Sequence, residues 1–290
     1  MSNSAADPFG LSPLWNALLA IYKAFSEICD RYGLRYYVTD GNAIGAVRHH
    51  GFIPWDDDFD VSMPRPDYER FIAIAGQELP AYLKVVNWRN TPEFDCMFLK
   101  IQDVRREKVL EVEEKVGYQL SNGIFIDIFP IDGYPESKVA EAWYLARMKC
   151  LWLLKRYYAE TLTAQTPKGK VAWIIGWLIS LVAFKIRSKA DCLEMADILN
   201  QRDVFGETKM CGRSATTMWK RVVIPTETYG TPVYFDFTDG VRVPLPHDFD
   251  TYLSYDYPNY MTLPPEEKRR PSHTYAKRCA WWLGPTMGEA

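Results

Sequence analysis

Residues Asp40–Asp60 read DGNAIGAVRHHGFIPWDDDFD, and four of the last five positions are aspartates: Asp56, Asp57, Asp58 and Asp60. Aromatic and aliphatic residues separate and flank these acids, which predicts a strand over 56–63 rather than a solvated acidic turn. Side chains alternate between the two faces of a strand, so Asp56, Asp58 and Asp60 are predicted to share one face. Crowded carboxylates repel each other unless a cation lies between them, and Mg²⁺ commonly joins a few carboxylates to substrate phosphates. The segment therefore indicates metal-assisted chemistry on a phosphate-bearing substrate, with an acidic turn as the alternative.

A glycine turn precedes the acids. Gly41 and Asn42 follow a predicted strand, Leu34–Val38, and open a short predicted helix, Ala43–His49. Glycine allows a phosphate to approach the backbone closely, Asn is a good helix N-cap, and a helix N-terminus is a ready anion site. Gly41 and Asn42 are therefore candidate phosphate-binding residues, and Arg48 at the far end of the helix is a third. A purely structural turn is the alternative.

A further acid is expected on a neighbouring strand. The run GIFIDIF, Gly123–Phe129, is a strongly apolar strand pattern with a single charge, Asp127. A carboxylate in a buried strand is costly unless it is paired or bound to a metal. Asp127 is the candidate for the remaining metal ligand, and a buried ion pair with an arginine or a loop cap is the alternative.

These features together resemble the nucleotidyltransferase fold of the DNA polymerase beta type. Within it, the string GNAIGAVRHHGFIPWDDDFDVSMPRPDYERF closely resembles the signature of the LicD family of phosphotransferases, which includes bacterial phosphorylcholine transferases and the fukutin-related proteins. GIFIDIFPIDGYP around Asp127 and NYMTLPPEEKRRPSH near the C-terminus are shorter matches, so the resemblance extends from about Leu34 to His273. One departure is Asn42, which stands where family members usually carry a small hydroxyl residue.

The resemblance implies a metal-dependent transferase. It would move a phospho-alcohol, with phosphocholine as the first expectation, from a CDP-linked donor to a cell-surface glycan or its lipid-linked precursor. Ethanolamine, glycerol and ribitol remain open as the transferred alcohol. Asp58, Asp60 and Asp127 are expected to hold Mg²⁺ or Mn²⁺, and Asp56 to complete the metal set or to act as general base. Two residues of the C-terminal match are also expected near the donor: Lys268 and His273.

Two other functions remain open. The enzyme could attach a nucleotide itself to a sugar, a protein or an RNA, although the chain lacks the long basic stripe that RNA binding favours. The chain could also be an inactive binding protein on the same fold, although such a protein would be expected to lose at least one acid of the set.

Composition favours an intracellular enzyme. The 290 residues are 48% hydrophobic, and the net charge of −3 argues against a nucleic-acid partner. Six scattered cysteines without a C-x-x-C pair suit free thiols in a reducing cytoplasm. The segment MSNSAADPFG has neither a basic start nor an apolar core, so no signal peptide is expected. The predicted location is the cytoplasm, with peripheral binding to the inner face of the cell membrane.

The order of elements predicts an α+β fold. Residues 1–135 are expected to form a nucleotidyltransferase-like mixed sheet with flanking helices. Residues 136–205 read as an insert of three helices that contacts the acceptor or a membrane surface. Residues 206–290 are rich in Pro and Tyr and are expected to be irregular and to pack back on the core.

The insert contains a helix that is apolar nearly all round, VAWIIGWLISLVAF at Val171–Phe184. Fourteen helical residues rise about 21 Å, short of the roughly 30 Å of a hydrocarbon core. Basic residues flank the segment on both sides: Lys168, Lys170, Lys185, Arg187 and Lys189. Such a helix suits a membrane interface, with Trp173 and Trp177 at the headgroups, and a buried core helix is an equal alternative.

Overall fold

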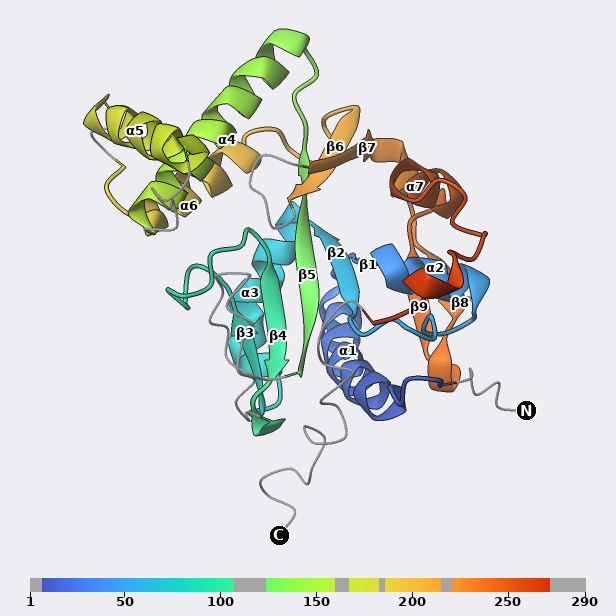
Figure 1. Ribbon diagram of the computed structural model, residues 1–290. Helices are drawn as coiled ribbons and strands as arrows, with labels where there is room; N and C mark the ends of the chain where they lie inside the picture. The colour runs from blue at the N-terminus through green and yellow to red at the C-terminus, as the bar shows by residue number, and fades with distance from the viewer. Residues whose placement is uncertain (1–6, 107–123, 160–166, 183–185, 215–220, 272–290) are drawn as a thin grey trace.

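The structure is a computed structural model that describes residues 7–106, 124–159, 167–182, 186–214 and 221–271. Seven α-helices lie in these residues: α1 (Ser12–Tyr32), α2 (Asp40–Arg48), α3 (Arg65–Glu78), α4 (Lys138–Tyr158), α5 (Pro167–Val182), α6 (Lys189–Asn200) and α7 (Phe249–Asp256). Nine strands accompany them: β1 (Tyr37–Val38), β2 (Asp60–Pro64), β3 (Leu83–Val86), β4 (Leu99–Asp103), β5 (Ile124–Gly133), β6 (Met210–Ser214), β7 (Arg221–Pro225), β8 (Val233–Asp236) and β9 (Arg242–Leu245). Figure 1 shows their arrangement.

Helix α1 illustrates how local sequence sets an element. Its apolar residues recur at helical spacing and are buried, including Leu18, Tyr22 and Phe25. Proline stands in its first turn, where its missing N–H costs nothing. Gly33 ends the helix with φ 62°, a conformation that glycine adopts without the strain of a side chain. The chain can then turn directly into β1.

A mixed sheet of seven strands forms the centre of the molecule. The order β1-β2-β5-β4-β3 runs across it, and β6 and β7 extend it from the far part of β5. Strands β2 and β5 are parallel, and the other pairs are antiparallel. The long strand β5 pairs with β4 over Ile124–Ile128 and with β6 over Ile131–Gly133. This confirms the predicted α+β class with a mixed sheet.

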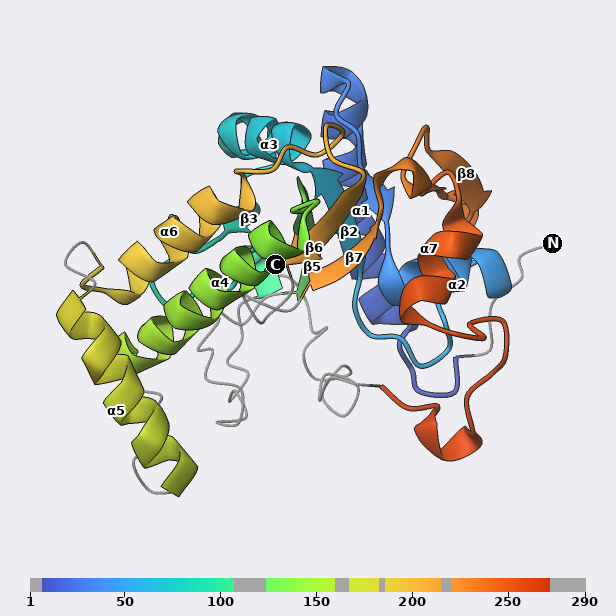
Figure 2. The ribbon, with the colours of Figure 1, turned by 90° about the horizontal axis from the view of Figure 1, so that it is seen from above.

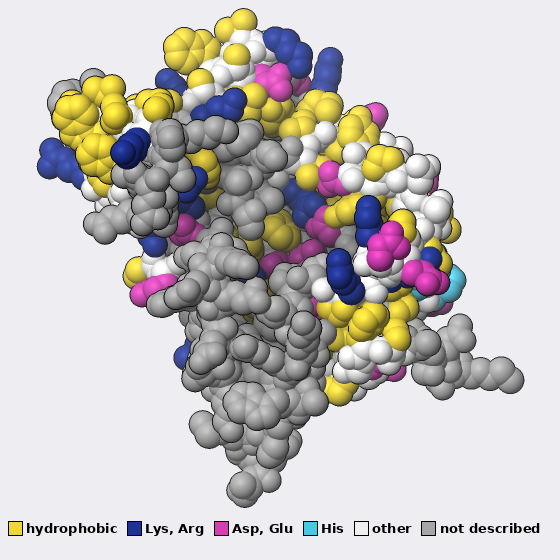
Figure 3. Space-filling model, viewed as in Figure 1, with side chains coloured by type: hydrophobic (Ala, Val, Ile, Leu, Met, Phe, Trp, Pro, Cys, Tyr) yellow, Lys and Arg dark blue, Asp and Glu magenta, His cyan; other side chains and the backbone are white. Residues whose placement is uncertain are grey.

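The two faces of the sheet differ in character. Helices α1 and α3 lie together on one side (Figure 2) and bury apolar strand residues such as Val61, Ile126 and Ile101. Residues that alternate with these, such as Asp60 and Asp127, point to the other face. Seen from the direction of Figure 1, that side contains a hollow in which acidic side chains lie among hydrophobic ones (Figure 3).

The chain after residue 206 contributes to the core as well as to irregular segments. Strands β6 and β7 join the main sheet, while β8 and β9 form a separate two-stranded sheet. Its apolar residues buried in the main core include Tyr229, Phe237, Leu245 and Leu253. The strands β6 to β9 were not expected from sequence, because short strands broken by proline carry a weak periodic signal.

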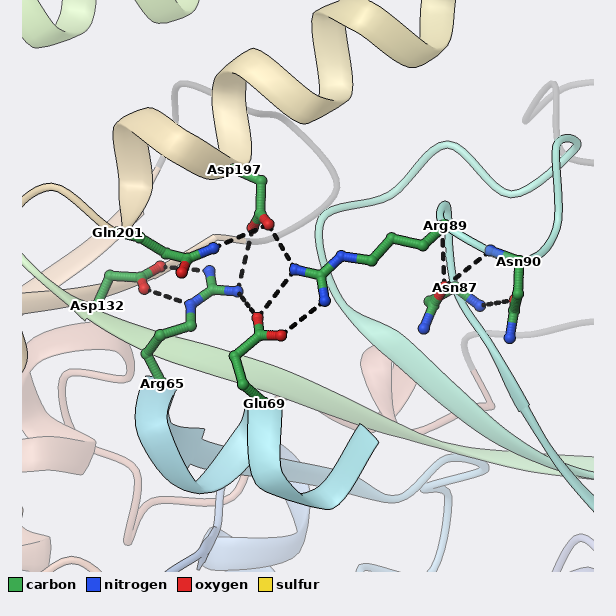
Figure 4. A network of polar contacts seen from close by, with 8 residues as sticks. All are labelled: Arg65, Glu69, Asn87, Arg89, Asn90, Asp132, Asp197 and Gln201. Carbon is green, nitrogen blue, oxygen red and sulfur yellow. Dashed lines mark hydrogen bonds and ion pairs between the residues drawn. The ribbon is translucent and has the colours of Figure 1, made fainter. Parts of the chain in front are cut away.

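The predicted insert consists of three helices, α4, α5 and α6, which project from the sheet as an arm (Figures 1 and 2). A buried polar network joins the base of this arm to the core (Figure 4). In it, Arg65 of α3 binds Asp132 of β5 through two hydrogen bonds of 2.6 and 2.9 Å and Asp197 of α6 at 3.1 Å. Arg89 joins Asp197 to Glu69 of α3. The network ties the arm to α3, β5 and the loop after β3.

Candidate active site

Asp60 and Asp127 stand opposite each other on the parallel strands β2 and β5, where they are register partners. The backbone N–H of Asp127 donates to the carbonyl of Phe59 at 2.9 Å, which holds this register at the start of β2. Paired residues of neighbouring strands point to the same face. Two carboxylates predicted from separate sequence blocks therefore lie side by side on the face away from α1 and α3.

The strand expected over 56–63 is shorter than predicted, because β2 begins only at Asp60. Strand alternation therefore does not place Asp56 and Asp58, and that part of the prediction is wrong. They lie in the loop before β2, whose backbone groups find partners elsewhere: the N–H of Asp56 donates to Ile53 at 2.9 Å. The loop still brings both acids to Asp60, because the charges of Asp56 and Asp58, and of Asp58 and Asp60, interact.

Asn42 holds this loop. Its side-chain oxygen accepts from the N–H of Asp60 at 2.7 Å, and its side-chain nitrogen donates to the carbonyl of Asp58 at 3.1 Å. Asn42 is fully buried. The predicted N-cap role is wrong: α2 begins at Asp40, and Thr39 occupies the N-cap. The side chain is a positioning group for the two acids.

Gly41 lies against Asp56. A Cβ atom at Gly41 would stand 2.5 Å from Oδ2 of Asp56, so only glycine leaves room for this carboxylate. The acid thereby sits at the beginning of α2, where the helix dipole favours negative charge. Among the described residues, Oδ2 of Asp56 has no hydrogen-bond partner although it is buried.

Crowding perturbs two of the acids. Burial, followed by the charge of Asp58 and a hydrogen bond with it, raises the pKa of Asp56 well above its usual range. Burial and the charges of Asp58, Asp40 and Asp127 likewise raise the pKa of Asp60. A cation bound among these carboxylates would stabilise their ionised forms.

Lysine and arginine side chains flank the acids, and sequence analysis missed both. Nζ of Lys100, on β4, lies 2.5 Å from Oδ1 of Asp127 and 3.4 Å from the ring centroid of Phe125. Lys100 and Asp127 are register partners on β4 and β5. No local sequence signal identifies Asp127 as the partner of Lys100.

Arg213 is the second cation. It reaches from β6 to the carboxylate of Asp40, with its guanidinium 5.2 Å from the ring centroid of Phe129. Tyr257 donates to the same carboxylate at 2.9 Å. Asp40 itself has φ 54°, a strained conformation for a residue with a side chain and one often found at functional sites. Asp40 and Arg213 are thus two further site residues that the sequence did not indicate.

The donor set suits a hard cation. All the acids named here offer oxygen ligands, which Mg²⁺ and Mn²⁺ prefer. Positive charge is in deficit among them, because Asp56 has a buried oxygen without a hydrogen-bond partner among the described residues and the pKa values of Asp56 and Asp60 are raised. Within the described residues, no three acids, histidines or cysteines already enclose an ion position.

Three further candidates were predicted from sequence to lie near the donor: Arg48, Lys268 and His273. Arg48 donates to the carbonyls of Tyr260 and, at 3.3 Å, Thr262, so it fastens α2 to the loop after α7. Lys268 is exposed in a short 3-10 turn. His273 falls outside the residues that the structure describes.

Comparison with known proteins identifies a matching family. Residues 33–159 match the family described as "LicD/FKTN/FKRP, nucleotidyltransferase domain". That range contains Gly41, Asn42 and the four predicted acids, together with Lys100. The match confirms the resemblance noted in the sequence.

A curated relative covers most of the chain. The "Lipopolysaccharide cholinephosphotransferase LicD" of Haemophilus influenzae is 28% identical over 257 residues, which are 88% of this chain and 92% of that protein. Two uncharacterized proteins, of Rickettsia typhi and Rickettsia prowazekii, match shorter stretches with 34% identity over 61 residues and 35% over 51. These two matches cover 21% and 18% of this chain.

Proposed function

We propose that this chain, which carries a LicD-type nucleotidyltransferase domain, transfers phosphocholine from CDP-choline to lipopolysaccharide or another cell-surface glycan, or to its lipid-linked precursor. The chain is a transferase of phosphorus-containing groups. The observation that carries the proposal is the pairing of Asp60 with Asp127, with Asp58 and Asp56 held beside them, inside the matched range.

The acids suit a metal-assisted displacement at phosphorus. Asp58, Asp60 and Asp127 would hold Mg²⁺ or Mn²⁺, which would neutralise charge on the phosphate oxygens during in-line transfer. The acceptor oxygen forms a bond to the phosphorus that carries choline, and the bond from that phosphorus to the oxygen of CMP breaks. The proton of the acceptor hydroxyl needs a base.

Asp56 is the proposed base. Its raised pKa makes its carboxylate a better proton acceptor near neutral pH than an ordinary aspartate. Gly41 leaves the space that this carboxylate occupies, and Asn42 fixes the loop that carries Asp58 and Asp60. The backbone at Gly41 and the side chains of Lys268 and His273 remain proposed donor contacts.

Lys100 and Arg213 reduce the negative charge that a diphosphate donor meets. Each already pairs with one acid, Lys100 with Asp127 and Arg213 with Asp40. Without them, the acids would repel the donor at the distances where unscreened charges interact strongly. They also give the site two cations from outside the acidic segment.

The test is a screen of donors with the purified chain. CDP-choline, CDP-ethanolamine, CDP-glycerol and CDP-ribitol are each incubated with Mg²⁺ or Mn²⁺ and a lipopolysaccharide acceptor, and CMP release and product mass are measured. The proposal expects acceptor-dependent CMP release, largest with CDP-choline, and a product heavier by one phosphocholine. Reactions without acceptor control for hydrolysis of the donor.

The rival function gives different products. An enzyme that attaches a nucleotide would release pyrophosphate from a nucleoside triphosphate and would leave CDP-choline intact. That result would replace the proposal. A catalytically inactive chain would bind a donor without turnover of any of the compounds.

The proposal places the enzyme in the cytoplasm, bound peripherally to the inner face of the cell membrane. A lipid-linked glycan precursor would present its hydroxyl groups at that surface. None of the helices in the described part of the chain combines the length and the hydropathy needed to cross a bilayer.

A further inference from the structure

Helix α5 exposes an unusual amount of apolar surface. Seven of its large hydrophobic side chains are 42–56% exposed: Val171, Trp173, Ile174, Ile175, Trp177, Leu178 and Leu181. The helix lies at the outer part of the arm, away from the sheet (Figures 1 and 2). The core-helix alternative is therefore wrong for this segment. Contiguous exposed apolar surface of this kind marks an interaction site.

Helix α5 packs on the rest of the molecule along one narrow side. A Cβ atom at Gly176 would stand 3.1 Å from Cβ of Tyr157, so Gly176 faces α4 closely. Trp173 contacts the same tyrosine in a tilted arrangement, with ring centroids 5.8 Å apart. At about 100° per residue, the side opposite Gly176 carries a four-residue row: Val171, Ile174, Leu178 and Leu181. The four are 50–56% exposed, as this geometry requires.

The two tryptophans border this outward row. Trp173 and Trp177 are four residues apart and so share one side of the helix, between the contact with α4 and the outward row. Each is 42% exposed. Tryptophan favours the boundary between hydrocarbon and headgroups because it has a large apolar ring and one N–H donor.

The charged residues in the segment around α5, residues 161–190, are all basic. Between Thr161 and Ala190 the sequence has five basic residues and no acidic residue, while the whole chain has a net charge of −3. Of the described basic side chains, Lys170 is exposed in the first turn of α5, and Arg187 is exposed in the segment before α6. Positive charge around an apolar face is complementary to an anionic lipid surface.

The length of α5 excludes a transmembrane role for it. Its 16 residues rise about 24 Å, short of the roughly 30 Å of a hydrocarbon core. Among the described residues, no helix is both long enough and apolar enough to cross a bilayer. A short apolar helix with basic ends suits a position in the plane of the bilayer surface.

We infer that α5 is a membrane-docking helix that lies flat on an anionic bilayer. Val171, Ile174, Leu178 and Leu181 enter the acyl boundary, and Trp173 and Trp177 lie at the headgroups. The buried network around Arg65 and Asp197 then holds the catalytic sheet at a fixed orientation to the membrane. The inference concerns the surface alone and holds whichever donor the enzyme uses.

The test uses the full chain and vesicles of two compositions. We expect co-sedimentation with vesicles that contain phosphatidylglycerol, weaker binding to vesicles of phosphatidylcholine alone, and a loss of binding as salt increases. Brominated lipids should quench tryptophan fluorescence. The variant Ile174→Glu/Leu178→Glu should bind at least tenfold more weakly with an unchanged melting temperature, because both side chains face outward.

The matched control is Val139→Glu/Trp143→Glu. These residues are 70% and 64% exposed near the start of α4, and Trp143 lies about 21 Å along the helix from Tyr157. This control should bind vesicles as the wild type does.

Three results would overturn the inference. The first is a wild-type chain that stays in the supernatant with anionic vesicles. The second is a collapsed melting temperature in Ile174→Glu/Leu178→Glu, which would mean that the face is buried within the chain. The third is a vesicle-independent dimer that this variant converts to a monomer, which would assign the face to a second copy.

Discussion

Lys100 and Asp127 are register partners on antiparallel strands, and their side chains meet in an ion pair of 2.5 Å. The lysine is 7% exposed and rests on the ring of Phe125. An acid assigned to metal binding thus already has a cation beside it. The lysine compensates the charge of this carboxylate in the folded chain, and a metal bound here would share the carboxylate with it.

Replacing Lys100 with Met should destabilise the chain by about 3 kcal/mol, because it leaves a largely buried carboxylate without its cation. Urea unfolding without metal measures this loss. The double variant Lys100→Met/Asp127→Asn should recover most of the stability, since no uncompensated charge remains. Equal stability of the single and double variants would contradict the pairing. Mg²⁺ should stabilise Lys100→Met more than the wild type.

Asp58→Asn and Asp60→Asn should each abolish turnover and leave the fold intact. The carboxylate of Asp60 is crowded by other acids, so its removal relieves repulsion and should leave the melting temperature unchanged or raise it. Melting without metal measures this. Mg²⁺ should stabilise both variants less than it stabilises the wild type. Normal Mg²⁺-dependent activity in either one would refute its assignment as a ligand.

Gly41→Ala should reduce activity strongly, because the new methyl group would meet the carboxylate of Asp56 at 2.5 Å and push it away. Gly76→Ala is the matched control. A Cβ at Gly76 meets nothing within 4 Å, and the residue lies on the exposed side of α3. The control should keep full activity and gain about 0.5–1 kcal/mol of stability from helix propensity. Equal activity of the two variants would show that the position of Asp56 does not matter.

Arg65→Met should cost about 3–5 kcal/mol, because the fully buried Asp132 would lose its ion pair with Arg65, while Asp197 would keep only its pair with Arg89. Arg31→Met removes an ion pair with Glu78 whose arginine side chain is 61% exposed. That control should change stability by less than about 1 kcal/mol. Denaturant unfolding distinguishes the two, and a similar small effect in both would mean that the network does not anchor the arm.

His49 should make the fold sensitive to mild acid. Burial, together with the charges of Arg48 and His50, lowers its pKa to about 4. Between this value and the unfolded pKa of about 6.5, the unfolded chain binds more protons, so stability falls as pH falls through that window. His49→Gln should remove part of this loss, as melting curves from pH 7 to 4 would show. His247→Gln, at an exposed position, is the control and should behave like the wild type.

Local sequence was enough to predict several secondary-structure elements and the acidic residues of the candidate site. The apolar residues of α1 recur at helical spacing, and Gly33 ends the helix, so both features can be read in the local sequence. An apolar run with one charge predicted β5 and singled out Asp127, because a lone charge in a buried strand needs a partner. The length of the apolar run Val171–Phe184 showed that it is too short to span a membrane. The residues on both sides of it are basic.

Tertiary structure decided which residues meet. The register of β2 on β5 sets Asp60 opposite Asp127, and pairing of β4 and β6 with β5 brings in Lys100 and Arg213. Periodicity reveals the faces of one element but carries no information on register or partner between distant strands. The loop acids depend on the side chain of Asn42, a contact across 16 and 18 residues. Whether α5 was core or surface could be read only from the packing of α4 against one side of it, because an all-round apolar helix has no distinguishable face.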